Sequence, residues 1–297
     1  MNAFTRYIAV GPVSVHDLAA NHPDIIAGYP MPTAVAGFGY KLGLDISRHV
    51  GNLFKVAGTA VVVHDHSEFV GHSKNPVETP GKDAAPIIDE FRARAELSFV
   101  IALDDIGYDD DGVDPAYLDE AARLLERKVP EWLFGGGKIF PMVGRTTVRV
   151  SSRDGLAATL RELPPGFVLV DRHDLMEKRV SEGRDTLDAL LDIIEFHDAN
   201  SGNDGPERLW ERRQPGWIVP LCVGFQAIET PRMRKKSRIN DGVTPHLYGE
   251  SIYSVGEYKS LRTLVAVNGD EALEGAFWRH RVNKNSGTYF VSAMQTS

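Results

Sequence analysis

Four side chains with metal-binding chemistry lie close together in the sequence, at His64, Asp65, His66 and His72. Side chains alternate across a strand, so His64 and His66 are expected on one face. A third ligand there would suit a metal-dependent ribonuclease. The sequence has no HExxH or related zinc signature, and polar histidines at a strand end are the simpler interpretation. We therefore predict no metal and no other cofactor, and we keep the ribonuclease as an alternative.

A glycine-rich loop followed by basic residues is the second candidate site, and its residues are Gly135, Gly136, Gly137, Lys138 and Arg145. The segment FGGGK lacks the GxxxxGK[ST] spacing of a phosphate-binding loop, which argues against nucleotide hydrolysis. Two interpretations remain. The segment is either a structural turn or a loop whose bare backbone admits a phosphate that Lys138 and Arg145 neutralise.

The charge of the chain is unevenly distributed. The net charge is −8 over 297 residues, yet eight basic and only three acidic residues lie between positions 206 and 240. The most basic part is RMRKKSRIND at 232–241, which contributes Arg232, Arg234, Lys235, Lys236 and Arg238. A polyanion responds to the local field rather than to the net charge. This segment is therefore either a solvated surface loop or a contact for a nucleic acid.

A helix with three glycines is predicted directly after the proline turn of AGYPMP at 27–32. Gly37, Gly39 and Gly43 each weaken a helix by about 1 kcal/mol relative to alanine. We expect them to let the helix pack closely against the sheet or a partner backbone. In a second interpretation, the turn also aims the helix N-terminus, with Lys41 further along, at RNA phosphates.

The elements that position these residues follow the order strand, helix, strand, strand, helix, strand. Their predicted ranges are 6–16, 33–45, 58–64, 92–103, 114–128 and a short strand within 135–141. This order is typical of a ferredoxin-like (RRM-type) fold. The segment 64–91 is too long for a tight hairpin and is interpreted as a projecting excursion.

Capping signals and hydrophobic periodicity define the two helices of this half. Thr33 is the expected N-cap of the first helix, with Val35, Phe38 and Leu42 on its inner face. Asp114 is the expected N-cap of the second, with a proline at the first helical position. The first strand is expected to bend at its Gly-Pro step.

The second half of the chain is less regular. We predict a core at 1–150 and an α/β portion at 151–297 packed on it, including a basic loop at 231–240. A strand follows a proline turn within 163–170, and Pro220 inside an apolar run predicts an edge strand or a bulge. A helix at 185–196, capped by Asp185, is expected to bury four apolar side chains: Leu187, Leu190, Leu191 and Ile194.

Composition limits the class of protein. The apolar fraction of 42% and the charged fraction of 25% are those of a globular protein. No signal peptide is visible, and the longest apolar runs are too short to span a membrane. The single cysteine, Cys222, lies in an apolar run and suits a buried thiol in a reducing compartment. We expect a cytoplasmic protein without a membrane partner.

Five blocks of the sequence resemble one protein family and occur in that family's order: GYPMPTAVAGFGYKL, GGGKIFP, LPPGFVLVDR with DTLDALLD, QPGWIVPLCVGFQAI, and TPHLYGESIYSVGEY. The family is the Csy-two family, the subtype F version of the Cas-five backbone subunit in type I-F CRISPR surveillance complexes. The resemblance extends from about Tyr7 to Tyr289. No single block is decisive, but five collinear blocks together are fairly specific.

The resemblance implies a RAMP-superfamily protein of the α+β class, with a ferredoxin-like core, a projecting β-hairpin thumb and a glycine-rich loop. It also implies a scaffold that is not an enzyme, holds the 5′ handle of the CRISPR RNA and docks neighbouring subunits for antiviral DNA interference. The partners it implies are the CRISPR RNA, a Cas-seven-type backbone subunit and the large Cas-eight-type subunit. Target DNA near the PAM is a further candidate. The excursion at 64–91 corresponds to the thumb.

The resemblance and the residue chemistry together define the candidate RNA contacts. Besides the glycine-rich loop, Arg145, Lys41 and the basic loop, the thumb adds Lys74 and Lys82, although it is only weakly basic. Aromatic candidates for base stacking are Tyr29, Phe38, Trp217 and Phe225. Two alternatives to this scaffold remain open: the metal-dependent ribonuclease described above, and a protein-interaction subunit without direct RNA contact.

Overall fold

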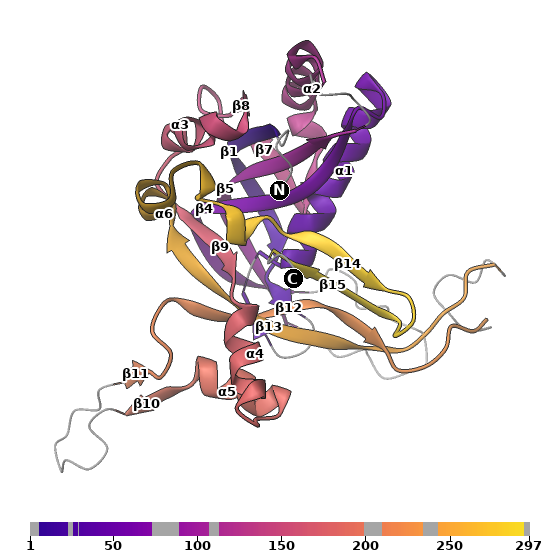
Figure 1. Cartoon of the computed structure of the whole chain (residues 1–297), viewed down its shortest axis with the longest axis vertical. Coiled ribbons are helices and arrows are strands. Elements are labelled where there is room, and N and C mark those ends of the chain that lie inside the picture. The colour runs from indigo at the N-terminus through magenta and orange to yellow at the C-terminus, as the bar shows by residue number, and fades with distance from the viewer. Residues whose placement is uncertain are drawn as a thin grey trace.

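The computed structural model describes residues 6–22, 26–28, 30–72, 89–106, 113–198, 210–233 and 243–293. Its architecture is α+β, because one large antiparallel sheet curls through the molecule and carries helices on both faces (Figure 1). The eleven described strands of this sheet are β1 (Arg6–Ala19), β4 (Phe54–His72), β5 (Asp89–Asp105), β6 (Leu133–Phe134), β7 (Gly137–Pro141), β8 (Thr147–Ser151), β9 (Phe167–Asp171), β12 (Ile218–Ala227), β13 (Gly249–Ser260), β14 (Arg279–Asn283) and β15 (Thr288–Ser292).

The helices of the described chain are α1 (Pro32–Val50), α2 (Pro115–Lys128), α3 (Leu156–Glu162), α4 (His173–Ser181), α5 (Thr186–Ile194) and α6 (Leu261–Asn268). Two small sheets accompany the large one: β2 (Asn21–His22) pairs with β3 (Ile26–Ala27), and β10 (Phe196–Asp198) pairs with β11 (Trp210–Arg212). None of the described helices has both the length and the apolar character needed to cross a membrane.

The large sheet has the order β14-β15-β12-β13-β9-β4-β5-β1-β7-β6. The eleventh strand, β8, is not part of this linear order and pairs with β1. In its centre, β1 is antiparallel to β5 and β7, and β5 is antiparallel to β4. β1 and β4 therefore run parallel with β5 between them, and α1 connects them. Apart from the short strands β2, β3 and β6, the chain passes through β1, α1, β4, β5, α2 and β7, which confirms the predicted order.

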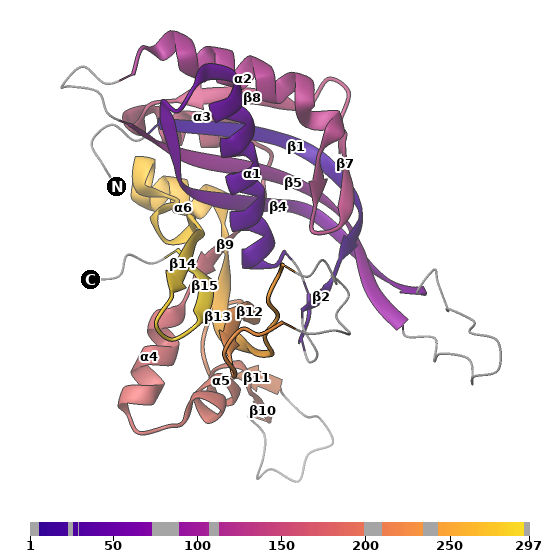
Figure 2. The same cartoon turned by 90° about the vertical axis from the view of Figure 1, so that its right-hand side faces the viewer.

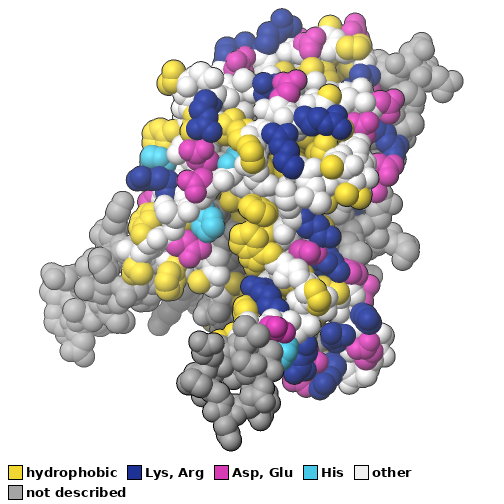
Figure 3. Space-filling view, turned by 90° about the vertical axis from the view of Figure 1, so that its left-hand side faces the viewer, with side chains coloured by type: hydrophobic (Ala, Val, Ile, Leu, Met, Phe, Trp, Pro, Cys, Tyr) yellow, Lys and Arg dark blue, Asp and Glu magenta, His cyan; other side chains and the backbone are white. Residues whose placement is uncertain are grey.

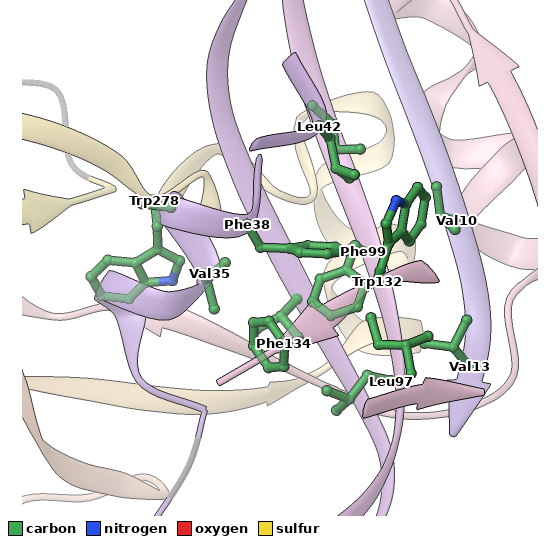
Figure 4. Close-up of a cluster of buried hydrophobic side chains, with 14 of the residues drawn as sticks. Val10, Val13, Val35, Phe38, Leu42, Leu97, Phe99, Trp132, Phe134 and Trp278 are labelled. Atoms are coloured by element: carbon green, nitrogen blue, oxygen red, sulfur yellow. The ribbon is translucent and has the colours of Figure 1, made fainter. Parts of the chain in front are cut away.

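Different helices cover the two faces of the central sheet. α1 and α2 bury one face over an aromatic core in which Phe38 lies among Phe99, Trp132 and Phe134 (Figure 4). α3 and α6 cover part of the other face, where Tyr7 stacks on Phe277 with ring centroids 5.5 Å apart. The inner side chains predicted for the first helix are all buried.

Two glycines of α1 allow the helix to approach the sheet closely. A Cβ atom at Gly39 would lie 1.7 Å from Thr59 Oγ1, and one at Gly43 would lie 2.5 Å from Val56 Cγ2. Thr59 and Val56 belong to β4, so any side chain there would push the helix away. A Cβ atom at Gly37 would meet nothing within 4 Å. The predicted packing against the sheet is confirmed for Gly39 and Gly43. Gly37 makes no such contact with the sheet, and its packing against a partner backbone stays a prediction.

The helix ends agree only in part with the predicted caps. α1 begins at Pro32 with Met31 in the N-cap position and no capping side chain, so the predicted cap Thr33 lies inside the helix. Proline is tolerated there because a first-turn amide has no intrahelical acceptor. α1 also runs beyond its predicted end. In α2 the prediction is confirmed, because the carboxylate of Asp114 accepts a hydrogen bond from Ala116 N.

The predicted inner face of α5 is partly wrong. Asp185 caps the helix as expected, but Leu187 and Leu191 are 59% and 52% exposed. Leu190 is buried as predicted and Ile194 is partly buried, while Ala189 and Ile193 are buried as well, in a small cluster with residues of α4, β12 and β13. The reason is that this short helix contacts the body of the protein along one narrow side, so a leucine-rich sequence leaves apolar side chains in solvent.

β12 has a partly unpaired edge at Pro220, which confirms that prediction. Pro220 lies opposite Val255 of β13, whereas β15 pairs with β12 only from Gly224 to Gln226. The missing amide of proline therefore leaves no ladder hydrogen bond unmade on that side. Cys222, two residues on, is buried, and its thiol donates to the carbonyl of Gly224 at 3.6 Å.

β4 and β5 form a ladder that extends far past the predicted strand ends. Their pairing runs from Phe54 opposite Asp105 to His72 opposite Asp89, and the hairpin projects beyond the helices (Figure 2). The projecting excursion predicted at 64–91 thus has paired strand at both of its ends, and the strands predicted at 58–64 and 92–103 are longer than expected. Residues 73–88 lie outside the described part of the chain.

The end of the chain returns to the central sheet. Trp278 is fully buried, and its indole Nε1 donates to the carbonyl of Leu169 in β9 at 3.2 Å. Its backbone also forms a bridge with Thr59 of β4. The second half of the chain thus supplies both sheet strands and core side chains to the first.

Candidate nucleic-acid interface

Next to the area that α3 and α6 cover, the central sheet presents a polar surface, which we call the open sheet face. Its residues are Ser14, His16, Arg94, Glu96, Lys138, Phe140 and Arg145. The strand register brings them together, because Phe140 lies opposite Ser14 and Lys138 lies opposite His16. Ser14 in turn lies opposite Glu96 on β5. On this side of the molecule, basic, acidic and hydrophobic side chains are interspersed (Figure 3).

Basic side chains outnumber acidic ones on the open sheet face. Arg94 shares the face with Glu96 because side chains alternate along a strand, and Arg94, Lys138 and Arg145 are all exposed. Arg145 Nη2 lies 3.4 Å from Glu96 Oε2, in a pair whose side chains are 50% and 30% exposed. An ion pair so open to water contributes little to stability. Arg145 can therefore leave Glu96 and bind a phosphate with little loss of stability.

Phe140 combines an exposed aromatic ring with a neighbouring cation. Its side chain is 41% exposed, and its ring centroid lies 4.8 Å from that of His16. Lys138 Nζ lies 5.5 Å from the centroid of the Phe140 ring. Such an exposed cation–π contact is worth only about 0.5–1 kcal/mol, so a ligand can replace it at small cost. The Phe140 ring is then available to stack on a base, and the Lys138 ammonium is available to neutralise the adjacent phosphate.

The three glycines before Lys138 form the turn between β6 and β7. Gly135 and Gly136 have φ angles of +52° and +81°, which favour glycine. Ala19 N donates to Gly135 O at 2.9 Å, and a Cβ atom at Gly137 would lie 2.7 Å from His16 O. The interpretation as a structural turn is confirmed. The phosphate interpretation stays a prediction, and the exposed Gly136 is the part of the turn open to a ligand.

Comparison with known proteins decides the family. The model of a family described as CRISPR-associated protein (Cas_Csy2) matches residues 9–291, nearly the whole chain. The chain belongs to the Csy2 family. The CRISPR-associated protein Csy2 of Pseudomonas aeruginosa (strain UCBPP-PA14) is 26% identical over 318 aligned residues, which cover 93% of this chain and 92% of that protein. The resemblance carried by the five sequence blocks is confirmed.

Lys41 of this Csy2-family chain lies outside the open sheet face. Lys41 Nζ is 3.9 Å from Asp45 Oδ2 one turn along α1, and Lys128 Nζ of α2 is 3.2 Å from Asp45 Oδ1. The structure therefore places Lys41 in an ion cluster between the two helices, away from the first turn of α1.

The basic loop extends the hairpin of β12 and β13. Arg232 bridges to His246 across the hairpin, and its Nη2 lies 2.9 Å from Glu229 Oε2. Most of the loop lies outside the described residues. The candidates in such segments are Tyr29, Lys74, Lys82, Arg234, Lys235, Lys236 and Arg238.

The predicted base-stacking residues differ in how far their rings are exposed to solvent. Phe38 is a core residue, 4% exposed, so its prediction as a base platform is wrong. Trp217 and Phe225 are each 45% exposed. Trp217 contacts Phe167 and Tyr258 with ring centroids 5.1 and 5.2 Å away. Both candidates belong to the β12 region of the Csy2-family fold and are separate from the open sheet face.

The histidine cluster does not form the predicted common face. A register shift between Val63 and Asp65 places His66 opposite Ala95, while His64 Nε2 lies 2.7 Å from Ser98 Oγ. Ala95 and Ser98 point to opposite sides of β5, so the two imidazoles do as well. His64 Nδ1 is also engaged, by the carbonyl of Pro165 at 3.0 Å.

Binding of a metal by His64 would require one of these hydrogen bonds to break. Burial lowers the pKa of His64, because the charged imidazolium loses solvation. Among the described residues, no group of three or more His, Cys, Asp or Glu side chains is arranged to hold a metal ion. The ribonuclease alternative therefore has no support from this geometry.

Sequence reasoning identified Lys138 and Arg145 and missed the other five members of the open sheet face: Ser14, His16, Arg94, Glu96 and Phe140. A signal for Phe140 was present, because alternation within GKIFP puts it on the same side as Lys138. No local sequence pattern indicated His16 or Arg94, because their place on the open sheet face depends on which strands pair with β1.

Proposed function

We propose that this Csy2-family chain is a non-catalytic subunit of a type I-F-like CRISPR surveillance complex that holds the 5′ handle of the CRISPR RNA. The observation that carries the proposal is the exposed Phe140 with Lys138 beside it on the open sheet face. Membership of a CRISPR-associated family supports a nucleic acid as the ligand of that face.

The proposed contacts follow from the chemistry of the open sheet face. Lys138, Arg145 and Arg94 neutralise backbone phosphates of the handle. Phe140 stacks on a base of an unpaired nucleotide, as aromatic side chains do in single-strand RNA recognition. His16 is placed beside Phe140, where its ring nitrogens reach a base edge or a ribose hydroxyl.

The proposal includes a ferredoxin-like RAMP core within residues 1–150. The central strand order β7-β1-β5-β4, with α1 and α2 on one face, supports it. In this interpretation the distal part of the β4–β5 hairpin is the thumb at 64–91. The portion at 151–297 packs on the core and carries the basic loop at 231–240 on a second hairpin.

The partners in this proposal are the CRISPR RNA, the adjacent Cas-seven-type backbone subunit and the large Cas-eight-type subunit, in the cytoplasm. Target DNA near the PAM is a further candidate partner. A role without catalysis fits the engaged nitrogens of His64.

The proposal is tested by expressing the chain with and without its genomic neighbours and sequencing the RNA that copurifies. We expect short RNAs that share one fixed 5′ segment. If neither preparation contains RNA, the protein-interaction alternative is favoured. If the RNA is heterogeneous and its trimming changes with added manganese or zinc, the ribonuclease alternative is favoured.

A further inference from the structure

A cavity of about 360 Å³ opens beside β4 at a division in the sheet. β9 pairs with β4 only at Val62 and Val63, so the next part of β4 faces Trp217 and Tyr258 across a gap. This volume is within the range of small-ligand sites, roughly 300–1,000 Å³. The cavity shares no lining residue with the open sheet face.

One wall of this cavity is aromatic. Phe167, Trp217 and Tyr258 form a continuous group of rings with centroids 5.1 and 5.2 Å apart. Phe167 and Trp217 are 42% and 45% exposed, which is high for large apolar side chains in successive contact. An exposed aromatic wall of this kind binds the flat face of a planar group or a cation.

A carboxylate lies on the β4 side of the cavity. Glu68, opposite Ala93, projects from the same face of β4 as His66, whereas Asp65, opposite Glu96, projects from the other face. None of the described residues that line the cavity is Lys or Arg. No hydrogen bond or ion pair joins Glu68 to another described residue. Burial raises the pKa of Tyr258, and the negative charge of Glu68 raises it further, in keeping with a carboxylate near the aromatic wall.

We propose that this cavity receives an arginine side chain of a partner protein. The guanidinium stacks on Trp217, because a planar delocalised cation binds best over an indole face. The carboxylate of Glu68 accepts hydrogen bonds from its N–H groups, and such charge-assisted bonds are the stronger kind. Arginine suits the site better than lysine, since only the guanidinium offers both a flat face and a fork of donors.

Charge decides between this occupant and a nucleobase. A base of RNA would also fit the aromatic wall, but its flanking phosphates would approach Glu68, and none of the described lining residues is a Lys or Arg that would offset the repulsion. An arginine from a protein has the complementary charge. The inference does not depend on the proposed RNA site, because the two surfaces have no residue in common.

The test uses the full-length chain labelled with 5-fluorotryptophan, in which the Trp217 fluorine resonance is assigned with Trp217→Phe. N-acetyl-arginine methylamide is titrated at low salt, and the neutral citrulline analogue is titrated in parallel. We expect a saturable shift of the Trp217 resonance with arginine and binding at least about tenfold weaker with citrulline, which keeps the shape but loses the charge. Glu68→Gln should weaken arginine binding about fivefold or more.

A matched control and three contrary outcomes make this experiment decisive. Glu177→Gln changes an exposed glutamate on α4 (70% exposed) and should leave arginine binding unaltered. The resonances of the other three tryptophans report whether each variant is folded. Equal binding of arginine and citrulline, no shift with either, or a Trp217 shift with AMP or CMP but not with arginine would each overturn the proposal.

Discussion

Lys138 and Phe140 are two residues apart on β7 and project from the same face, and in the proposed RNA site they offer different interactions to one nucleotide. The ammonium of Lys138 acts through charge, so its contribution depends on salt. The ring of Phe140 acts through stacking, which any base can satisfy. The two contributions can therefore be separated by measuring affinity at several salt concentrations.

The first prediction concerns this pair and uses RNA recovered from the copurified complex. Phe140→Ala should weaken binding by about 1–3 kcal/mol at every salt concentration, because a stacking contact is lost. Lys138→Ala should lower the slope of log affinity against log salt by about 1, because one phosphate contact is lost. Filter binding over a salt series measures both effects.

The control for this pair is Lys178→Ala, which removes an exposed lysine from α4 and should change neither quantity. If both Phe140→Ala and Lys138→Ala bind like the unaltered protein, the RNA contact lies on another surface. The hairpin of β12 and β13 would then be the next surface to examine.

The second prediction concerns pH and His64. Burial lowers the pKa of folded His64, so below its ordinary pKa the unfolded chain takes up a proton that the folded chain resists. The free energy of unfolding should therefore fall as the pH is lowered from about 7 to about 5. His64→Gln should lessen that fall.

Urea unfolding of both proteins at the two pH values measures this difference. The glutamine amide can still reach Ser98 or Pro165, the partners of the imidazole, so the variant should fold. Equal losses of stability in the two proteins would show that His64 does not contribute to the pH dependence.

At the scale of elements, α1 shows why a helix would carry glycines. The helix propensity lost at Gly39 and Gly43 is offset by packing, because both positions touch side chains of β4. The same approach helps Phe38 to enter the aromatic core of β5, β6 and the segment after α2. Gly37 lies on the solvent side of the same helix and has no such role.

The third prediction compares two glycines in this one helix. Gly37→Ala should stabilise the protein by about 0.5–1 kcal/mol, because alanine favours the helix and meets no neighbour. Gly39→Ala should destabilise it, despite the same gain in propensity, because its Cβ atom would overlap the side chain of Thr59. Chemical denaturation of both variants gives the two signs directly.

A double variant provides the check on this explanation. Thr59→Gly in the Gly39→Ala background removes the side chain that the new methyl group meets and should recover part of the lost stability. Destabilisation by Gly37→Ala, or stabilisation by Gly39→Ala, would contradict the packing explanation.

At the scale of the whole molecule, the two halves of the chain share one sheet and one set of cores. β9 of the second half pairs with β4 of the first. Phe277 covers Tyr7, and Trp278 binds both Thr59 and Leu169. The open sheet face therefore depends on contacts made by residues near the end of the chain.

The fourth prediction concerns a fragment of residues 1–150. Without α3, α6 and Phe277, the fragment would expose the apolar side chains Tyr7, Ala60, Val62 and Val100. We expect it to aggregate or to unfold without a cooperative transition, since so large an apolar patch is unfavourable in water. Circular dichroism during heating, compared with the full chain, measures this. A cooperative transition in the fragment would show that 1–150 is an independent domain.

The sequence by itself determined the order of the central elements, the caps of α2 and α5, the inner side chains of α1 and the family. These features depend on local patterns: side-chain periodicity, capping residues and blocks of similar sequence. The sequence also predicted that Lys138, Arg145 and the glycine turn act together, and the structure places Lys138 and Arg145 on one face of the sheet. Local chemistry and spacing carried that information.

Only the tertiary structure decided which residues share a surface. The joining of His16, Arg94 and Phe140 depends on β1 lying between β5 and β7, and the separation of His64 from His66 depends on a shift in strand register. The exposure of Leu187 and the burial of Phe38 likewise depend on what each helix packs against. The physical reason is that strand pairing and burial join residues far apart in the chain, and no local pattern records their partners.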